Sequence, residues 1–185
     1  MYSQYFALPC CAYLFVVLML QTACSVAPLS ENAADSYRYF DLVAYCKQQA
    51  TAINGKTVRK TVVLKGERET KQVVIDGQQE LSVFSASDLN KPAWRDSYTI
   101  DTTFVGDTLQ VSYKALSDKL RTQLLRVQCL PPQVVVRISA ENRVSNPLYT
   151  LTEQLEYMPE KGYIIKSQQK ILGIAPSFFD IRVDF

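Results

Sequence analysis

The second half of the chain alternates apolar and polar residues with a period of two. The apolar side chains Tyr98, Ile100 and Phe104 are separated by polar ones, and Gly106-Asp107 then turns the chain. The same alternation recurs in the segments 109–115, 125–129, 134–140, 149–157, 163–171 and 179–185. One apolar and one polar face is typical of an antiparallel sheet that is covered on one side. The connections are too short for the crossovers of a parallel sheet.

Helical spacing occurs earlier, over residues 36–53. The apolar residues of this segment recur at intervals of three and four, which forms the stripe of an amphipathic helix. They include Tyr39, Val43, Cys46 and Ala50. Asp35 or Ser36 can cap the start of this helix, and Asn54-Gly55 is a favourable end.

Between the helix and the alternating segments, the pattern predicts a hairpin and a second helix. The β-branched segments 57–65 and 69–75 flank a turn that begins at Gly66, which is typical of a hairpin. A short helix is predicted over 78–86. Residues 87–94 are predicted to form a loop, because their proline bars regular pairing.

These elements together predict one α+β domain over residues 36–185. We expect a curved antiparallel meander of about eight or nine strands, packed on the helix over 36–53. A one-sided sheet bent around a helix encloses an apolar interior. That interior is either filled by side chains or left open as a ligand cavity.

The first 30 residues carry no charged side chain. Residues 6–20 (FALPCCAYLFVVLML) form an apolar stretch that matches the core of a secretory signal peptide in length. This stretch is shorter than the ~20 residues of a transmembrane helix. The N-terminus is therefore predicted to direct export.

Small residues and a cysteine follow this stretch directly. The sequence there is Leu20-Gln21-Thr22-Ala23-Cys24-Ser25. It resembles the lipobox of bacterial lipoproteins. The resemblance implies a signal peptide over 1–23, lipidation of Cys24 and a tether over 24–35, with stable anchoring by several acyl chains. Ser25 after the cysteine implies delivery to the outer membrane of a Gram-negative envelope, with the domain facing the periplasm.

Two features depart from the pattern of that family. Gln21 occupies the position where a branched residue is usual, and no Lys or Arg precedes the apolar stretch. An uncleaved N-terminal anchor helix and a signal peptide cleaved at another position are therefore alternatives.

Cys46 and Cys129 are the cysteines that remain after such processing. Each lies on the apolar side of its predicted element. In an oxidising periplasm, two thiols that face one core can form a disulfide. They can equally be inert buried thiols.

Candidate chemistry is sparse. The absence of histidine excludes His-based triads and His-ligated metals, and a net charge of +2 gives no basis for nucleic-acid binding. Ser167-Gln168-Gln169-Lys170 matches the S-x-x-K pattern of penicillin-binding enzymes, but it lies in a predicted strand and the companion motifs are missing. We therefore predict no catalytic residue, no metal site and no cofactor.

Two further features carry functional alternatives. The predicted hairpin is basic, and its cations are Lys56, Arg59, Lys60, Lys65, Arg68 and Lys71. Such cations can contact lipid phosphates or an acidic partner, or form the solvated face of a sheet. Trp94, the only tryptophan, is predicted either to recognise a partner or to close the open end of the sheet.

These observations predict a non-enzymatic lipoprotein of the cell envelope. Its periplasmic domain is expected to bind a lipid, an acyl chain or an envelope protein, and its anchor to bind the membrane. The combination is similar to that of uncharacterised outer-membrane lipoproteins. In architecture, residues 36–185 also resemble the lipoprotein-localisation carrier proteins, whose sheet holds acyl chains.

Two other classes of protein are alternatives. The pattern Phe179-x-Ile181-x-Val183-x-Phe185 resembles the last strand of small outer-membrane β-barrels, which turn apolar residues toward lipid. The second alternative is an envelope hydrolase.

Overall fold

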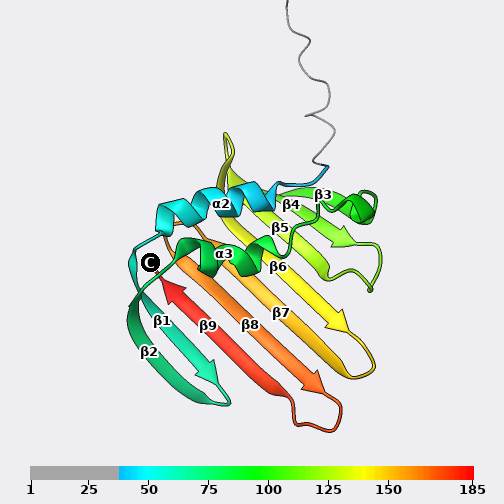
Figure 1. Ribbon diagram of the computed structural model, residues 1–185. Helices are drawn as coiled ribbons and strands as arrows, with labels where there is room; N and C mark the ends of the chain where they lie inside the picture. Colours follow the sequence, from blue (N-terminus) through cyan, green and yellow to red (C-terminus); the bar gives the residue numbers. More distant parts are fainter. Residues whose placement is uncertain (1–37) are drawn as a thin grey trace, which may run out of the picture. The chain divides into compact units, whose positions relative to one another are not determined.

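The computed structural model describes residues 38–185, and these form two helices, a short 3-10 turn and one large sheet (Figure 1). The helices are α2 (Leu42–Ile53) and α3 (Gly77–Ser85), and the turn is η1 (Pro92–Trp94). The strands are β1 (Thr57–Leu64), β2 (Glu67–Val74), β3 (Tyr98–Val105), β4 (Thr108–Ala115), β5 (Thr122–Leu130), β6 (Val134–Ser145), β7 (Tyr149–Met158), β8 (Gly162–Ile171) and β9 (Ser177–Asp184). The predicted signal peptide, Cys24 and the tether lie outside the described residues.

All nine strands form one antiparallel sheet in the order β2-β1-β9-β8-β7-β6-β5-β4-β3. Strands β3 to β9 follow each other as the predicted meander. The β1–β2 hairpin extends the sheet at the β9 edge of this meander, because β1 pairs with β9. β2 and β3 are the two edges, so the sheet is open. The α+β class and the curved antiparallel meander are confirmed.

The first helix begins later than predicted. It starts at Leu42, and the carboxylate of Asp41 caps it by accepting a 2.9 Å hydrogen bond from the backbone N–H of Ala44. The residues before it are held outside the helix by the Asn90 side chain, which accepts from the N–H of Tyr39 and donates to the carbonyls of Tyr39 and Phe40. This long-range contact satisfies the backbone groups that a longer helix would have used.

The hairpin and the second helix lie where they were predicted, with a tighter turn. Lys65 and Gly66 alone connect β1 to β2, and both have positive φ. A two-residue turn of this kind matches the twist of the flanking strands. The carboxylate of Asp76 caps α3.

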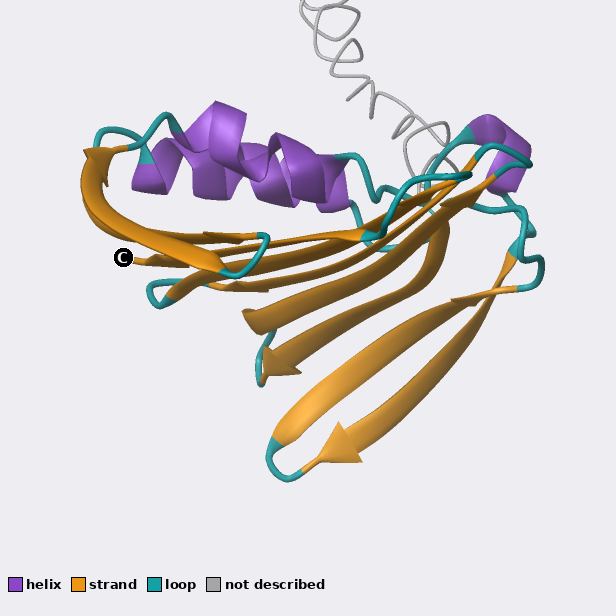
Figure 2. Ribbon diagram, turned by 90° about the horizontal axis from the view of Figure 1, so that it is seen from below, coloured by secondary structure: helices purple, strands orange, loops and turns teal. Residues whose placement is uncertain are grey.

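Both helices cover the same face of the sheet, and the other face carries no described helix (Figure 2). Gly77 allows the two helices to approach closely, because a Cβ there would lie 2.1 Å from the carbonyl oxygen of Ala50. We call the two faces the helix side and the helix-free side. Buried strand residues lie on the helix side at alternate positions, as in Leu125, Val127 and Ile138.

The helices cross the sheet near one end of its strands. The β6–β7 and β8–β9 hairpins extend well beyond them at the opposite end (Figure 1). The same strands therefore have a covered end and an uncovered end.

Candidate functional site

Aromatic side chains fill the space between the helices and the sheet. Phe84 of α3 packs edge-to-face against Tyr157 and Tyr163, with ring centroids 5.8 Å apart in both pairs. Tyr39 packs in the same way against Tyr98 and Tyr113. Of the two predicted interiors, this arrangement corresponds to the one that is filled by side chains.

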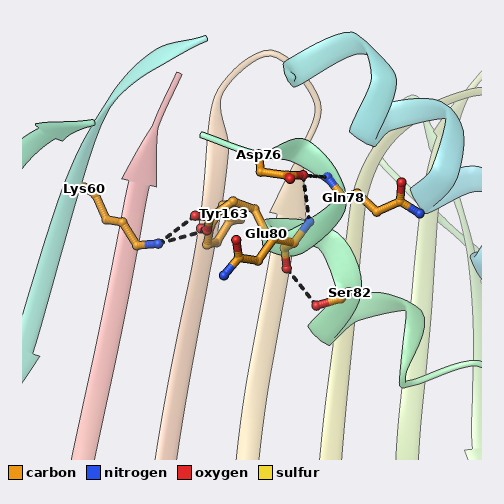
Figure 3. Close-up of polar contacts among 7 residues, drawn as sticks. Lys60, Asp76, Gln78, Glu80, Ser82 and Tyr163 are labelled. Carbon is orange, nitrogen blue, oxygen red and sulfur yellow. Dashed lines mark hydrogen bonds and ion pairs between the residues drawn. The ribbon is translucent and has the colours of Figure 1, made fainter. Parts of the chain in front are cut away.

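A polar cluster lies within this interior (Figure 3). Glu80 of α3 accepts hydrogen bonds of 2.8 and 2.9 Å from the ammonium group of Lys60, and another from the hydroxyl of Tyr163. Burial raises the pKa of Tyr163, and the carboxylate of Glu80 raises it further. The phenol therefore stays protonated and serves as a donor. The cluster joins α3 to β1 and β8, and the charge of Glu80 is balanced by Lys60.

A second polar cluster lies under the segment after α3. Asn142 donates to the hydroxyl of Ser87 at 2.9 Å, and Thr122 donates to the Ser87 carbonyl at 3.2 Å. Ser87 and Thr122 are fully buried. Their hydroxyls cannot reach a substrate, so we assign this cluster to the packing of the segment that follows α3.

Cys46 and Cys129 are both free thiols in the structure. Cys46 belongs to the core and Cys129 packs against it, so both face the same core, as predicted. Burial raises the pKa of the Cys46 thiol to about 11. The disulfide between them stays a prediction.

The S-x-x-K segment does not assemble a catalytic pair. It lies in the middle of β8, where side chains alternate between the two faces. Ser167 shares the parity of the buried Tyr163 and therefore points to the helix side, whereas Lys170 points to the helix-free side. The sheet itself separates the hydroxyl from the amine.

The basic hairpin does not present one basic patch. Arg59 and Lys60 point to opposite faces, Lys60 is paired with Glu80, and Lys71 is paired with Glu69 at 2.6 Å. Trp94 is half-buried against Tyr98. The ammonium group of Lys91 lies 4.1 Å from the centroid of the Trp94 ring.

The helix-free side is polar and hollowed. Cross-strand ion pairs join Arg126 to Glu141 at 3.1 Å and Arg137 to Glu156 at 2.6 Å. Three adjoining pockets of about 400, 370 and 360 Å³ lie on this side, between β5 and β1 in the sheet order. The second and third pockets expose mainly polar surface. The first exposes mainly apolar surface, and its lining includes Val63, Phe178 and Phe179.

The uncovered end of the sheet carries exposed apolar side chains. Leu148, in the turn between β6 and β7, is 68% exposed, and Leu172 and Ile174, in the turn between β8 and β9, are 75% and 62% exposed. The backbone N–H of Leu172 donates to the carbonyl of Leu148 at 2.9 Å, so the two turns lie side by side. We call Leu148, Ile171, Leu172 and Ile174 the apolar tip.

Local hydrogen bonds hold the apolar tip in shape. The side-chain oxygen of Asn146 accepts from the backbone N–H groups of Leu148 and Tyr149, both at 2.9 Å. In the second turn, the N–H of Ile174 donates to the carbonyl of Ile171 at 3.1 Å. Exposed apolar residues also occur at other hairpin ends, such as Phe104 and Val134. The tip differs because two neighbouring hairpins bring four such residues together.

The apolar tip was not predicted from the sequence. The composition of the two turns could have indicated it. Large apolar residues are unusual in turns, and they occur here in Asn146-Pro147-Leu148 and in the segment 171–176 (ILGIAP). Their meeting in space depends on the pairing of β7 with β8 and was not visible along the chain.

Comparisons with known proteins identify no relative. No protein-family model, no curated protein and no solved structure matches the chain. Within the described residues, neither helix combines the length and apolar character needed to cross a bilayer.

Proposed function

We propose that this protein is a non-enzymatic, membrane-anchored protein of the cell envelope, and that its domain docks on a lipid surface through the apolar tip. The observation that carries the proposal is the tip itself, in which Leu148, Leu172 and Ile174 are each more than half exposed on two adjoining, hydrogen-bonded turns. Folding of the domain does not account for them, because they contribute nothing to the core. Exposed apolar groups gathered at one place mark an interaction surface.

The expected strength of this contact is low in isolation. Full burial of a Leu or Ile side chain contributes roughly 1.5–3 kcal/mol. Three partly buried side chains therefore supply on the order of 4–6 kcal/mol, which corresponds to a dissociation constant between about 1 mM and about 40 μM.

The anchor predicted at Cys24 makes so weak a contact effective. A tether confines the domain to the membrane surface, so that docking becomes an intramolecular step at high effective concentration. The anchor would supply attachment, and the apolar tip would supply orientation.

The test uses the full chain in lipid vesicles, held there by its own N-terminal segment. Trp94→Phe removes the only tryptophan, and Leu172→Trp then introduces one at the tip. With lipids brominated along their acyl chains, we expect strong quenching of this tryptophan. Val134→Trp in the same Trp94→Phe chain is the matched control, because Val134 is also exposed and lies at the opposite end of β6.

Equal quenching at positions 134 and 172, or none at 172, would contradict the proposal. Adding Leu148→Ser and Ile174→Ser to the Leu172→Trp chain is expected to reduce the quenching. If position 172 crosslinks to a single envelope protein and is not quenched by lipid, the apolar tip docks on the predicted protein partner instead.

A further inference from the structure

A pocket of about 360 Å³ lies on the helix-free side, immediately behind the apolar tip. Its lining residues are Arg143, Thr150, Thr152, Gln168 and Lys170. They are two cations, two hydroxyls and one amide, and none is a carboxylate. All these groups can donate hydrogen bonds to an anion.

The register of three strands brings these residues together. Arg143 of β6 is opposite Thr152 of β7, and Thr152 is opposite Gln168 of β8. Thr150 is opposite Lys170 in the row nearer the turns. Arg143 and Lys170 are 27 positions apart in sequence, but only one strand lies between theirs.

Neither cation of the pocket is neutralised within the described residues. On the same side, Arg126 and Arg137 are paired with Glu141 and Glu156. Arg143 and Lys170 form no such ion pair among the residues that the structure describes. Two unpaired cations in one pocket attract an anion, and the fork of an arginine side chain matches the geometry of a phosphate.

We propose that this pocket binds the phosphate of an anionic lipid headgroup. The inference rests on the proposed function, because it assumes that the apolar tip is docked in the bilayer. Lys170 directly precedes Ile171 of the tip, and Arg143 is three residues from Asn146. At ~3.3 Å per strand residue, the pocket lies within about 10 Å of the turns. A tip that reaches the acyl chains therefore places the pocket at the level of the headgroups, which occupy the outer ~5–7 Å of each leaflet.

The experiment uses the full chain carrying Trp94→Phe and Leu172→Trp, in brominated vesicles of phosphatidylglycerol or of phosphatidylcholine. The quenching of the tip tryptophan reports the equilibrium between docked and undocked domain. Arg143→Gln with Lys170→Gln is expected to lower the docking constant in phosphatidylglycerol about tenfold to thirtyfold, since each basic residue near an anionic surface contributes about 1 kcal/mol. In phosphatidylcholine, the same variant is expected to change docking less than twofold.

Arg59→Gln with Lys114→Gln is the matched control. Both residues are exposed cations on the helix-free side, away from the tip, and their removal lowers the net charge by the same amount. The control is expected to change docking in phosphatidylglycerol less than threefold. An equal loss in both double variants would overturn the pocket and indicate general charge attraction.

The outcomes separate this inference from the proposed function. If the Arg143 and Lys170 variant docks like the parent chain in phosphatidylglycerol, the headgroup site is wrong and the apolar tip still stands. If the tip tryptophan is quenched in neither lipid, the proposed function fails first. Titration of the full chain in phosphatidylcholine with inorganic phosphate tests the other source of this chemistry. Phosphate binding that depends on Arg143 and Lys170, without any effect of phosphatidylglycerol on docking, would overturn the headgroup assignment.

Discussion

Apolar side chains are buried at one end of the strands β7 and β8 and exposed at the other. Near the helices, Tyr157 and Tyr163 are at most 2% exposed and pack against Phe84. At the hairpin turns, Leu148 and Leu172 are more than two-thirds exposed. The strands β7 and β8 run through both regions, so sheet formation does not explain the difference.

Apolar residues of this sheet therefore have two different roles. At the covered end, burial removes apolar surface from water and stabilises the fold. At the apolar tip, the fold leaves apolar surface in water, where only a ligand or partner can cover it. Substitutions at the two ends should therefore affect different measurements.

The largest expected effect on stability is at the covered end. Phe84→Ala removes a ring that is 2% exposed and packed on two tyrosines, and is expected to cost about 3–5 kcal/mol of unfolding free energy. Urea denaturation measures it. Leu148→Ala is the control for truncation of an apolar side chain, and a loss of similar size there would break the comparison.

Gly77→Ala tests the approach of the two helices. The new Cβ would lie 2.1 Å from the carbonyl oxygen of Ala50, so α3 must shift away from α2, at an expected cost of about 3 kcal/mol. Gln78→Ala, at the next and exposed position of α3, should change stability by less than about 0.5 kcal/mol in the same urea experiment. Equal losses of stability in Gly77→Ala and Gln78→Ala would show that the close approach of α2 and α3 at Gly77 does not determine stability.

Alkaline pH should destabilise the covered end selectively. Burial raises the pKa of Tyr98 to about 12 and also raises the pKa values of Tyr45, Tyr113, Tyr157 and Tyr163. Phenols of the unfolded chain ionise near pH 10, so the unfolded state loses protons first. Stability present below pH 10 is therefore lost as the pH rises from 10 through 12. A free energy of unfolding that stays constant between pH 9 and 11.5 would contradict this.

Tyr163→Phe tests how much the Lys60–Glu80–Tyr163 cluster contributes to stability. The substitution keeps the ring and removes the hydrogen bond to the Glu80 carboxylate, at an expected cost of about 1.5–3 kcal/mol. Thermal and urea unfolding measure it. Tyr149→Phe, a half-buried tyrosine of β7 outside the cluster, should be nearly neutral. Equal losses in the two variants would assign the effect to the hydroxyl group in general.

The smallest effect on stability is expected at the apolar tip. Leu148→Ser with Leu172→Ser should change the unfolding free energy by less than about 0.5 kcal/mol, because both side chains are exposed. The same pair of substitutions should reduce docking on vesicles. A large loss of stability would indicate that the tip supports the fold and would remove the main argument for a lipid contact.

Much of the fold was predictable because local patterns and tertiary structure agree. Alternation over 97–185 predicted β3 to β9, and the spacing after Tyr39 predicted α2. The start of α2 was wrong, since it depends on Asn90, which is distant in sequence but hydrogen-bonds to the backbone of Tyr39. The pairing of β1 with β9 is also a long-range contact. It could not be predicted, because no local sequence pattern indicates which strand pairs with the free edge of the meander.

The candidate site was less predictable than the fold. In the sequence, Lys170 stands out only as part of the S-x-x-K pattern, and strand alternation places it on the face opposite Ser167. Its neighbour Arg143 was not singled out, because the two approach each other only through the register of β6, β7 and β8. Whether the charge of each arginine is balanced also depends on which carboxylate lies on the neighbouring strand.

The sequence by itself determined on which face of a strand or helix each residue lies, because periodicity of two or of three to four assigns each side chain to a face. Only the tertiary structure decided where the helices lie along the strands, and hence which end of the sheet is covered. That choice follows from contacts such as those of Phe84 and Gly77, which join segments distant in sequence. It leaves Leu148, Leu172 and Ile174 exposed, since two short helices cover only part of a nine-stranded sheet.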